Sequence, residues 1–457
     1  MSDFYTIGIE TSCDDSCVAI LKNERDLVVN LISSQIDIHT LFGGVVPEIA
    51  SRKHLEAINP LIEKALSDAN LNYSDIDLVS VTKGPGLMGS LLVGISAGKA
   101  LSLAANKPMI GANHMEGHIC ANYLAHKDLK PPFVTLVVSG GHTYLVKVKS
   151  YTDYEVIGKT RDDAAGESYD KVARKMGLGY PGGPKIDKLA KEGNPKAVDF
   201  PRVMLEKDSY DFSFSGLKTA VINYIHQMEQ KNIDFDKADV AASFQDAVVD
   251  VLVEKSMRLI KESGYDKLAL SGGVAANSRL RGRLEESCRE NNIKFYYPPI
   301  ELCTDNAAMI AMTGYLHYQA GEVSDKFMKV YPNLEIWFMR RKKRDGDNSL
   351  KKYNSMKKIS TILWILTGLG VLGFGIYFKE IFEIIFGIAG VIYGIYNHRT
   401  RITSLTAISR IEKNKLSFLA LCIVIYSLVN PLANIAVIYD LFKRDYVING
   451  GFDEKTL

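Results

Sequence analysis

Short apolar runs alternate with longer amphipathic segments along the first 150 residues. The runs 4–10, 16–22 and 77–82 have the length and the side chains of β-strands. Segments 54–70 and 90–105 carry apolar residues at helical spacing. Strands that alternate with helices are typical of an α/β fold, so we predict that class for the first part of the chain.

Two apolar segments are each interrupted by a short, small and polar turn. They are TIGIETSCDDSCVAIL (6–21) and VTLVVSGGHTYLVKV (134–148). Both predict β-hairpins, and exposed backbone N–H groups at such turns can hold phosphate oxygens. The pair indicates a duplicated domain that clamps a nucleotide, although two unrelated hairpins would give the same pattern. Helical patterns dominate after residue 160, with one late strand at 265–273.

The character of the chain changes after Lys326. A polar and basic stretch is followed by twenty residues without a charge, the length that crosses the hydrocarbon core of a bilayer. We therefore expect an enzyme body, a basic linker and a membrane tail of two to three helices. The expected bounds are 1–338 for the body, 339–358 for the linker and 359–457 for the tail, with helices at about 359–378, 381–396 and 416–439.

Charge divides the chain in the same places. The body has a formal net charge of −7 and the linker one of +7. Basic runs at 340–358 and 397–415 should lie on the cytoplasmic side, which directs the first helix outward, the second inward and the third outward. A buried helical domain is the alternative for the tail. An acidic body is unusual for a protein that binds nucleic acid alone, so RNA binding would need a local basic patch or a partner.

Two further features of the sequence indicate the cellular compartment. The N-terminus has no basic region followed by an apolar one, so no secretory signal is expected. Six cysteines are scattered and complete no zinc pattern, which favours reduced cytosolic thiols. We expect a cytoplasmic catalytic domain that is tethered to the membrane by the tail.

His114 and His118 are four residues apart in GANHMEGHIC. On a helix this spacing places both imidazoles on one face, within reach of one metal ion. A third ligand must come from elsewhere, and Asp305 in ELCTDNAAMIA is the best source. A two-histidine, one-carboxylate site is typical of non-haem Fe(II). The alternatives are two structural histidines and an Asp305 that simply caps the following helix.

Glycine-rich segments supply candidate anion and ligand sites. In 271–281 a strand is followed by two glycines, a turn that can direct N–H groups at an anion, and Asn277 can offer its amide to a base or ribose. In 162–187, Asp170 and Asp187 flank Gly182 and Gly183, where carboxylates would suit hydroxyl or ammonium groups. A solvated loop is the alternative for the segment 162–184, and a glycine turn like that of 271–281 is weakly specific by itself.

Several familiar catalytic patterns are missing. SGLKT (215–219) lacks the upstream glycine spacing of a Walker A loop, and no GxSxG is present. The acidic residue between the histidines, Glu116, is not placed as in the HExxH of zinc proteases. The sequence therefore gives little support to P-loop ATPase, serine hydrolase or zinc protease chemistry.

Ten motifs in this order resemble the TsaD family, which makes N6-threonylcarbamoyladenosine in tRNA. The resemblance covers about residues 4–335. The motifs are GIETSCDDS, GGVVPEIASR, KGPGLMGSL, NHMEGH, VSGGHT, DDAAGESYDK, YPGGP, DFSFSGLKT, SGGVAAN and CTDNAAMIA.

The resemblance implies a fold, a site and a reaction. The fold is the duplicated actin/Hsp70-like, ribonuclease H-like ATPase fold in two lobes. One Fe(2+), or Zn(2+) or another divalent metal, would bind at His114, His118 and Asp305. The threonylcarbamoyl group would pass from threonylcarbamoyl-AMP to N6 of adenosine 37 in tRNAs that read codons beginning with A, with release of AMP. Implied substrate contacts are Val137, Val138, Ser139, Gly140, Gly141, Asp170, Gly183, Asp187 and Asn277.

Partners and rival functions follow from the same resemblance. It implies tRNA, helper subunits of the TsaB and TsaE type, and no tail, so the lipid bilayer is a partner that the family does not explain. Arg279, Arg281 and Arg283 are candidate tRNA contacts, or a solvated helix face. The rival functions are an ATP-dependent phosphotransferase or ATPase of the same fold, a metallopeptidase, and a membrane-anchored nucleotide sensor.

Overall fold

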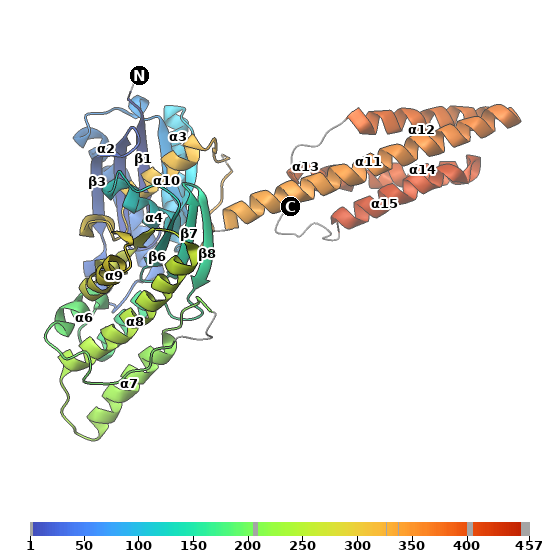
Figure 1. Cartoon of the computed structure of the whole chain (residues 1–457). Coiled ribbons are helices and arrows are strands. Elements are labelled where there is room, and N and C mark those ends of the chain that lie inside the picture. The colour runs from blue at the N-terminus through green and yellow to red at the C-terminus, as the bar shows by residue number, and fades with distance from the viewer. Residues whose placement is uncertain (1–2, 204–208, 326, 337, 400–404, 449–457) are drawn as a thin grey trace. The chain divides into compact units, whose positions relative to one another are not determined.

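The computed structural model describes residues 3–203, 209–325, 327–336, 338–399 and 405–448. The chain divides into two compact units, Met1–Trp337 and Phe338–Leu457. Figure 1 shows the sheets and helices of the first unit and the helices of the second.

Two five-stranded sheets of the same topology form the framework of the first unit. Their strand orders are β3-β2-β1-β4-β5 and β10-β9-β6-β7-β8. In each sheet, the three strands that come first in the chain pair antiparallel. The two later strands of the sheet add to them in parallel. The repeated order confirms the duplicated actin-like fold. The strands are β1 (Tyr5–Glu10), β2 (Asp15–Lys22), β3 (Asp26–Ser34), β4 (Leu78–Gly84), β5 (Met109–Asn113), β6 (Phe133–Val138), β7 (Thr143–Ser150), β8 (Asp153–Lys159), β9 (Lys267–Ser271) and β10 (Lys294–Tyr296).

Helices cover the faces of both sheets (Figure 1), and this explains why the central strands are buried along their whole length rather than at alternate residues. Every residue of β4 and β6 is buried. The helices of the first unit are α1 (Ile36–Thr40), α2 (Pro47–Asp68), α3 (Met88–Ala105), α4 (His114–Ala125), α5 (Ala165–Lys175), α6 (Gly182–Ala190), α7 (Ser215–Gln230), α8 (Lys237–Ser263), α9 (Ser278–Glu290) and α10 (Ala307–Gln319).

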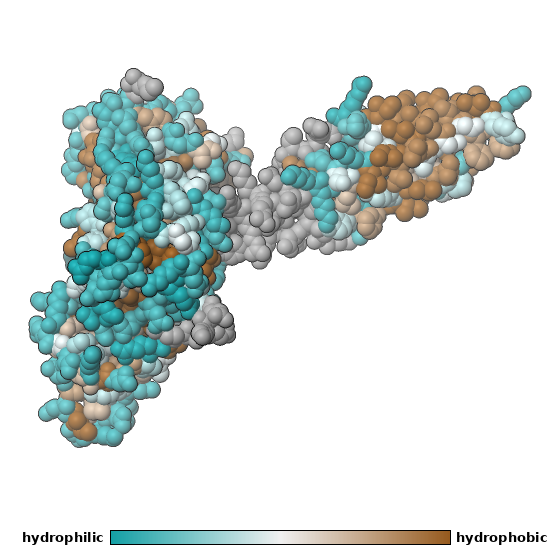
Figure 2. All heavy atoms as spheres, viewed as in Figure 1, coloured by the Kyte–Doolittle hydropathy of each residue, from teal (hydrophilic) through white to brown (hydrophobic). Residues whose placement is uncertain are grey.

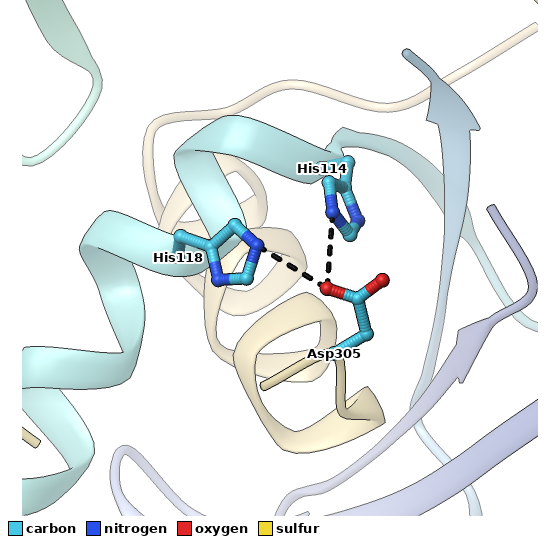
Figure 3. A group of neighbouring side chains, drawn as sticks. All are labelled: His114, His118 and Asp305. Carbon is cyan, nitrogen blue, oxygen red and sulfur yellow. Dashed lines mark ion pairs between the residues drawn. The ribbon is translucent and has the colours of Figure 1, made fainter. Parts of the chain in front are cut away.

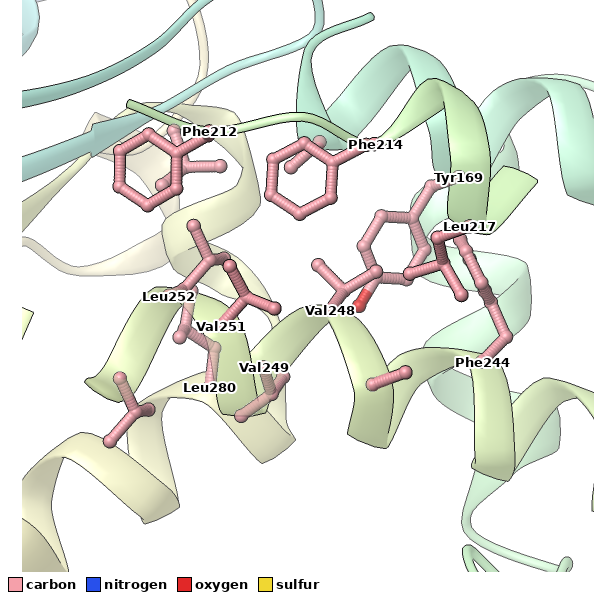
Figure 4. Packing of buried hydrophobic residues seen from close by; sticks show 14 of the residues in the cluster. Tyr169, Phe212, Phe214, Leu217, Phe244, Val248, Val249, Val251, Leu252 and Leu280 are labelled. Carbon is pink, nitrogen blue, oxygen red and sulfur yellow. The ribbon is translucent and has the colours of Figure 1, made fainter. Parts of the chain in front are cut away.

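The largest apolar core lies around α8 in the second half of this unit. Figure 4 shows Phe244 and Val248 of α8 among Tyr169, Phe212 and Phe214, and all five are buried. Burial of side chains of this size is the main favourable term in folding. This core fixes α5, α6 and α9, whose ends carry the predicted glycine turns.

Helices α4 and α10 link the two halves of the first unit. Helix α10 comes late in the chain but packs on the first sheet, where a Cβ on Gly8 would lie 2.2 Å from the carbonyl oxygen of Ala307. Helix α4 follows the first sheet but bonds to the second, since Asn122 Nδ2 donates to Ser271 Oγ at 2.9 Å. The beginnings of α4 and α10 therefore meet where the two halves join.

The described residues of the second unit, 338–399 and 405–448, form helices, as predicted for the tail. They are α11 (Phe338–Phe378), α12 (Ile381–Arg399), α13 (Leu405–Asn414), α14 (Leu416–Val429), η4 (Pro431–Ala433) and α15 (Asn434–Ile448). Helices α11 and α12 pack closely through glycines, because a Cβ on Gly368 would lie 2.9 Å from Gly387 O. Figure 2 shows apolar residues gathered over the surface of this unit.

Two predicted bounds in the tail differ from the structure. Residues 339–358, expected as a basic linker, form the first half of α11, since the stretch has no proline and is rich in helix-forming lysine and arginine. The predicted single helix 416–439 is two helices, because Asn430 ends α14 and Pro431 cannot continue it.

Three described helices are long and apolar enough to cross a membrane: α3, the Leu350–Phe378 part of α11, and α12. Helix α3 packs on β4 within the first unit. The candidate spans outside the sheet-containing unit are therefore α11 and α12.

Candidate metal centre and ligand turns

His114 and His118 occupy the first turn and a half of α4. The helix begins where Asn113 caps it, its side chain accepting from the N–H groups of Met115 and Glu116. The predicted spacing on one helix face is confirmed, and both imidazoles are buried. Their ring centroids are 4.8 Å apart (Figure 3).

Asp305 completes the cluster from the segment before α10. Its Oδ1 lies 3.3 Å from His114 Nε2 and 3.3 Å from His118 Nε2 (Figure 3). The capping alternative for Asp305 is wrong: Asn306 is the cap, with its Oδ1 accepting from Met309 N at 3.0 Å. Asp305 is thereby left to face the two histidines.

The three side chains fit one divalent ion. Their ligand atoms all lie within 4.8 Å of one another. Within the described part of the chain, neither ring nitrogen of the buried His118 has a hydrogen-bond partner, which is costly in a protein interior unless another ligand satisfies it. Ligand atoms about 2.0–2.2 Å from a common ion lie at most about 4.4 Å apart. The two 3.3 Å separations from Asp305 Oδ1 fall within that limit.

Glu10 is a fourth participant that sequence reasoning missed. It ends β1, is fully buried, and its Oε2 lies 2.9 Å from His114 Nδ1 and accepts from Thr82 Oγ1 at 2.6 Å. A carboxylate that ends a buried apolar strand needs a hydrogen-bonding or charged partner. The position of Glu10 at the end of such a strand was therefore the sequence feature that could have identified it. The contact leaves His114 Nε2 as the nitrogen that faces Asp305.

Electrostatics of the cluster follow from this packing. Burial alone would lower the pKa of His114, but the carboxylates of Asp305 and Glu10 raise it well above its ordinary value. Burial alone would raise the pKa of Asp305, but His114 and His118 lower it. The carboxylates are therefore ionised and able to neutralise a cation.

Both predicted hairpin turns surround the cluster. Burial, then the charges of His114 and His118, lower the pKa of His142 at the second turn to about 4. At the first turn, burial raises the pKa of Asp15 to about 7, with the Asp305 charge adding to the shift. The cluster is thus close enough to act electrostatically on both turns.

The second turn offers two unoccupied N–H groups. Ser139 N donates to His142 O at 2.8 Å, so this N–H is already used. Among the described residues, no hydrogen bond is formed by the N–H groups of Gly140 and Gly141, and a Cβ at either would meet nothing within 4 Å. Val137 and Val138 end the buried strand β6 that holds the turn.

The start of α5 and the glycine pair after β9 press against this turn. A Cβ on Gly166 would lie 2.5 Å from Ser139 O, and a Cβ on Gly272 would lie 2.4 Å from Val138 O. Gly272 also has a φ of +89°, which favours glycine. These close approaches bring the segments around 139, 166 and 272 together, although they are far apart in sequence.

Asp170 and Gly183 belong to one local structure. Asp170 Oδ1 accepts from Gly182 N at 2.7 Å and so fixes the loop that begins α6. Burial raises the pKa of Asp170, while bonds from Gly182 and Gly183 oppose that shift. A Cβ on Gly183 would meet nothing within 4 Å, so this backbone borders open space.

Asp187 and Asn277 lie on either side of Ser278. Asp187 Oδ1 accepts from Ser278 Oγ at 2.9 Å. Asn277 caps α9 through Leu280 N at 2.9 Å and donates to Gln245 Oε1 at 2.7 Å. Its amide is therefore largely engaged by the protein. A cavity of about 410 Å³ adjoins this pair, with Gln245, Ser278 and Arg279 in its lining.

The three arginines proposed as tRNA contacts, Arg279, Arg281 and Arg283 of α9, are all paired within the protein. Arg279 and Arg283 bond to Asp246, and Arg281 lies over the Tyr297 ring and donates to Pro298 O. Their charges are thus balanced by acidic or carbonyl groups. The geometry adds no support to their assignment as tRNA contacts.

Fold and site together define a class. It is a protein with a duplicated actin-like fold that has a possible metal site of two histidines and one carboxylate at the junction of its halves, beside open glycine turns.

Comparison with known proteins gives the family. Residues 26–312 match TsaD, tRNA N6-adenosine threonylcarbamoyltransferase. Enzymes of that name from Clostridioides difficile and Clostridium perfringens are each 56% identical, covering 74% and 72% of this chain and 99% and 97% of theirs. One from Clostridium kluyveri is 55% identical over 73% of this chain and 98% of its own. The chain belongs to the TsaD family, and it is an acyltransferase that modifies tRNA at N6 of adenosine.

The tail lies outside this identification. The family match ends at residue 312, and the relatives are covered almost completely by about three quarters of this chain. The predicted departure from the family at the C-terminus is thereby confirmed. Family membership also favours group transfer over the phosphotransferase, peptidase and sensor functions.

Proposed function

We propose that His114, His118 and Asp305 hold one Fe(2+) that serves the transfer of a threonylcarbamoyl group from threonylcarbamoyl-AMP to adenosine 37. The observation that supports this most is the meeting of three ligand side chains beside an open glycine turn. The donor set also accommodates Zn(2+). A bound divalent ion supplies Lewis-acid polarisation of an acyl oxygen.

The chain's own groups have distinct tasks in this proposal. The N–H groups of Gly140 and Gly141 bind the phosphate of the adenylate, rather than that of Ser139, which is already bonded to His142. Gly183 and Asp187 lie along the adenosine, and Asp170 keeps the Gly182–Gly183 loop in place. Asn277 fixes the start of α9 beside them.

The reaction is a substitution at the carbamoyl carbon. The N6 amine attacks this carbon, the bond to the phosphate oxygen breaks, AMP leaves and one proton is lost from N6. The donor is already activated as a mixed anhydride, so orientation of the two substrates and stabilisation of charge carry most of the catalysis.

His114→Ala tests the metal assignment. We expect the variant to lose bound metal and transfer activity while its circular dichroism spectrum is unchanged. His226→Ala is a matched control, since His226 is exposed on α7, away from the cluster. Wild-type transfer by a metal-free His114→Ala protein would overturn the assignment.

We further propose that the body works with helper subunits of the TsaB and TsaE type. Helices α2 and α3 pack together and expose Leu55, Met88 and Leu92, at 64%, 52% and 49% of their surface. The acidic body also needs basic surface from elsewhere for tRNA. Co-purification with the wild type, lost in Leu55→Glu/Leu92→Glu, would support this; binding that survives both changes would contradict this surface.

The tail is proposed to tether a cytoplasmic body to the membrane. The Leu350–Phe378 part of α11 and the whole of α12 have the length and apolarity of spans, and the basic stretch 339–358 precedes the first apolar run. Fractionation tests this: the full chain should stay with membranes after a carbonate wash, and release by carbonate would contradict it.

A further inference from the structure

The C-terminal hairpin of the tail is too short to cross a bilayer twice. Helix α14 has 14 residues and α15 has 15, so each is about 21–23 Å long, against about 30 Å of hydrocarbon. They are joined at Asn430, whose side chain accepts from Leu432 N. Apolar segments of this length are typical of re-entrant elements rather than of spans.

The middle of α15 contacts α11 near the start of its apolar part. Asp440 Oδ2 accepts from Trp364 Nε1 at 2.9 Å. Lys443 Nζ lies 2.7 Å from Asp440 and 3.7 Å from Glu412 of α13, and all three charged side chains are fully buried. Tyr353 Oη in turn donates to Glu412 at 2.5 Å.

This buried ion cluster marks the side of the membrane to which the chain returns. It joins α15 and α13 to Tyr353 and Trp364 of α11, which lie within and just after the basic stretch 339–358. Buried charges at a bilayer centre are costly, whereas the interface beside a basic segment tolerates them. The end of α15 therefore lies on the same side as the start of α11.

The tip of the hairpin contacts both α11 and α12. Asn430 Nδ2 donates to Glu383 Oε1 in the first turn of α12 at 3.0 Å, and Leu432 lies against Gly370 of α11. Gly370 precedes the last residue of α11 by eight positions, or about 12 Å. The tip is thus within the thickness that α11 spans.

The outer surface of the hairpin is apolar along its length. Exposed large side chains are Leu421, Val424 and Leu428 on α14 and Ile435, Ile438 and Phe442 on α15. Figure 2 shows how apolar residues gather on this unit. Lipid acyl chains fit this surface, whereas water does not.

We infer that α14, η4 and α15 form a re-entrant hairpin that enters and leaves the bilayer on the cytoplasmic side. This inference rests on the membrane attachment proposed above. It reverses the outward third helix expected from sequence and places the C-terminal end of α15 on the same side as the enzyme body.

Cysteine labelling in the full chain tests this topology. Intact cells are treated with a membrane-impermeant maleimide, in a Cys422→Ser background that removes the one cysteine of the tail. The test positions are Glu380→Cys between α11 and α12, Leu432→Cys at the tip, and a cysteine appended after Leu457. Lys413→Cys on α13 is the cytoplasmic control.

We expect Glu380→Cys to react with the maleimide in intact cells. Lys413→Cys and the appended cysteine should react only after the cells are permeabilised. Leu432→Cys at the tip should stay protected even then. Protection of Glu380→Cys would mean that the membrane attachment itself fails. Reaction of the appended cysteine or of Leu432→Cys, with Glu380→Cys also reactive, would overturn only the re-entrant hairpin. Leu428→Cys repeats the tip test if Leu432→Cys is not produced.

Discussion

Glu10 and His114 are joined by a 2.9 Å contact between Oε2 and Nδ1, from strand β1 to the first residue of α4. The contact fixes which nitrogen of the imidazole faces Asp305. It also ties the cluster to the first sheet, because Glu10 is bonded to Thr82 of β4. Metal affinity should therefore depend on a residue that is not itself a ligand.

Glu10→Gln should weaken metal binding by about 10–100-fold while leaving the three ligands in place. The amide can still contact His114, but it no longer balances the positive charge. Competition with a chromophoric chelator measures the affinity, and transfer activity should recover at high metal concentration. An unchanged affinity would mean that Glu10 only packs against the cluster.

Gly166→Ala should impair adenylate binding without removing the metal. The new methyl group would lie 2.5 Å from Ser139 O and 2.7 Å from Gly140 Cα, so the turn must move. Overpacking of this kind costs about 1–3 kcal/mol. The KM for threonylcarbamoyl-AMP should rise at constant metal content. Gly282→Ala on α9, where a methyl group meets nothing within 4 Å, is the control; equal KM values would refute the contact.

The sequence predicted this site better than it predicted the contacts inside it. The spacing of His114 and His118 is local and can be derived from one helix. Asp305 was proposed as the third ligand from its local sequence, but its proximity depends on α10 crossing to the first sheet, and the local pattern could not exclude a simple helix cap. Asn277 and Ser139 use their polar groups within the protein, a consequence of three-dimensional neighbours such as Gln245 that no local pattern reveals.

The same limit applies to the tail. Apolar length alone predicted a helix over 416–439, yet Asn430 and Pro431 divide it. The strands β3, β5, β8 and β10 were not predicted, because they are short or carry mixed exposure along the edges of the sheets. The central strands were recognised because they are buried on both faces.

Stability of the body should depend on pH through His317. Burial alone would lower the pKa of this imidazole, but Glu116 at 2.8 Å and Glu322 at 3.1 Å raise it to about 9. The imidazole of His317 therefore binds its proton more tightly in the folded state than in the unfolded state. The stabilisation is therefore complete below about pH 6.5 and is lost as the pH rises through about 9.

His317→Gln isolates this effect. At pH 6 the free energy of unfolding of the variant should be about 1–3 kcal/mol lower than that of the wild type, and the difference should fall toward zero by pH 10. Urea denaturation of residues 1–337, followed by circular dichroism, measures both proteins. A difference that is independent of pH would show that only packing is lost.

Residues 1–337 should fold and act without the tail. Relatives of about this length are covered at 97–99% by the matched part of the chain, and the body is a compact unit of its own. The truncated protein should be recovered in the soluble fraction with the transfer rate of the full chain in detergent. Aggregation of the truncated body, or loss of most of its activity, would mean that the tail is part of the catalytic structure.

The most direct test is a metal titration of the transfer reaction. Wild-type protein is stripped with a chelator, reloaded with increasing Fe(2+), and given labelled threonylcarbamoyl-AMP and tRNA together with the helper subunits. We predict transfer that rises in proportion to occupancy of one site per chain and that is absent at every Fe(2+) level in Asp305→Ala. Full transfer by the stripped wild type, or by Asp305→Ala, would contradict the account.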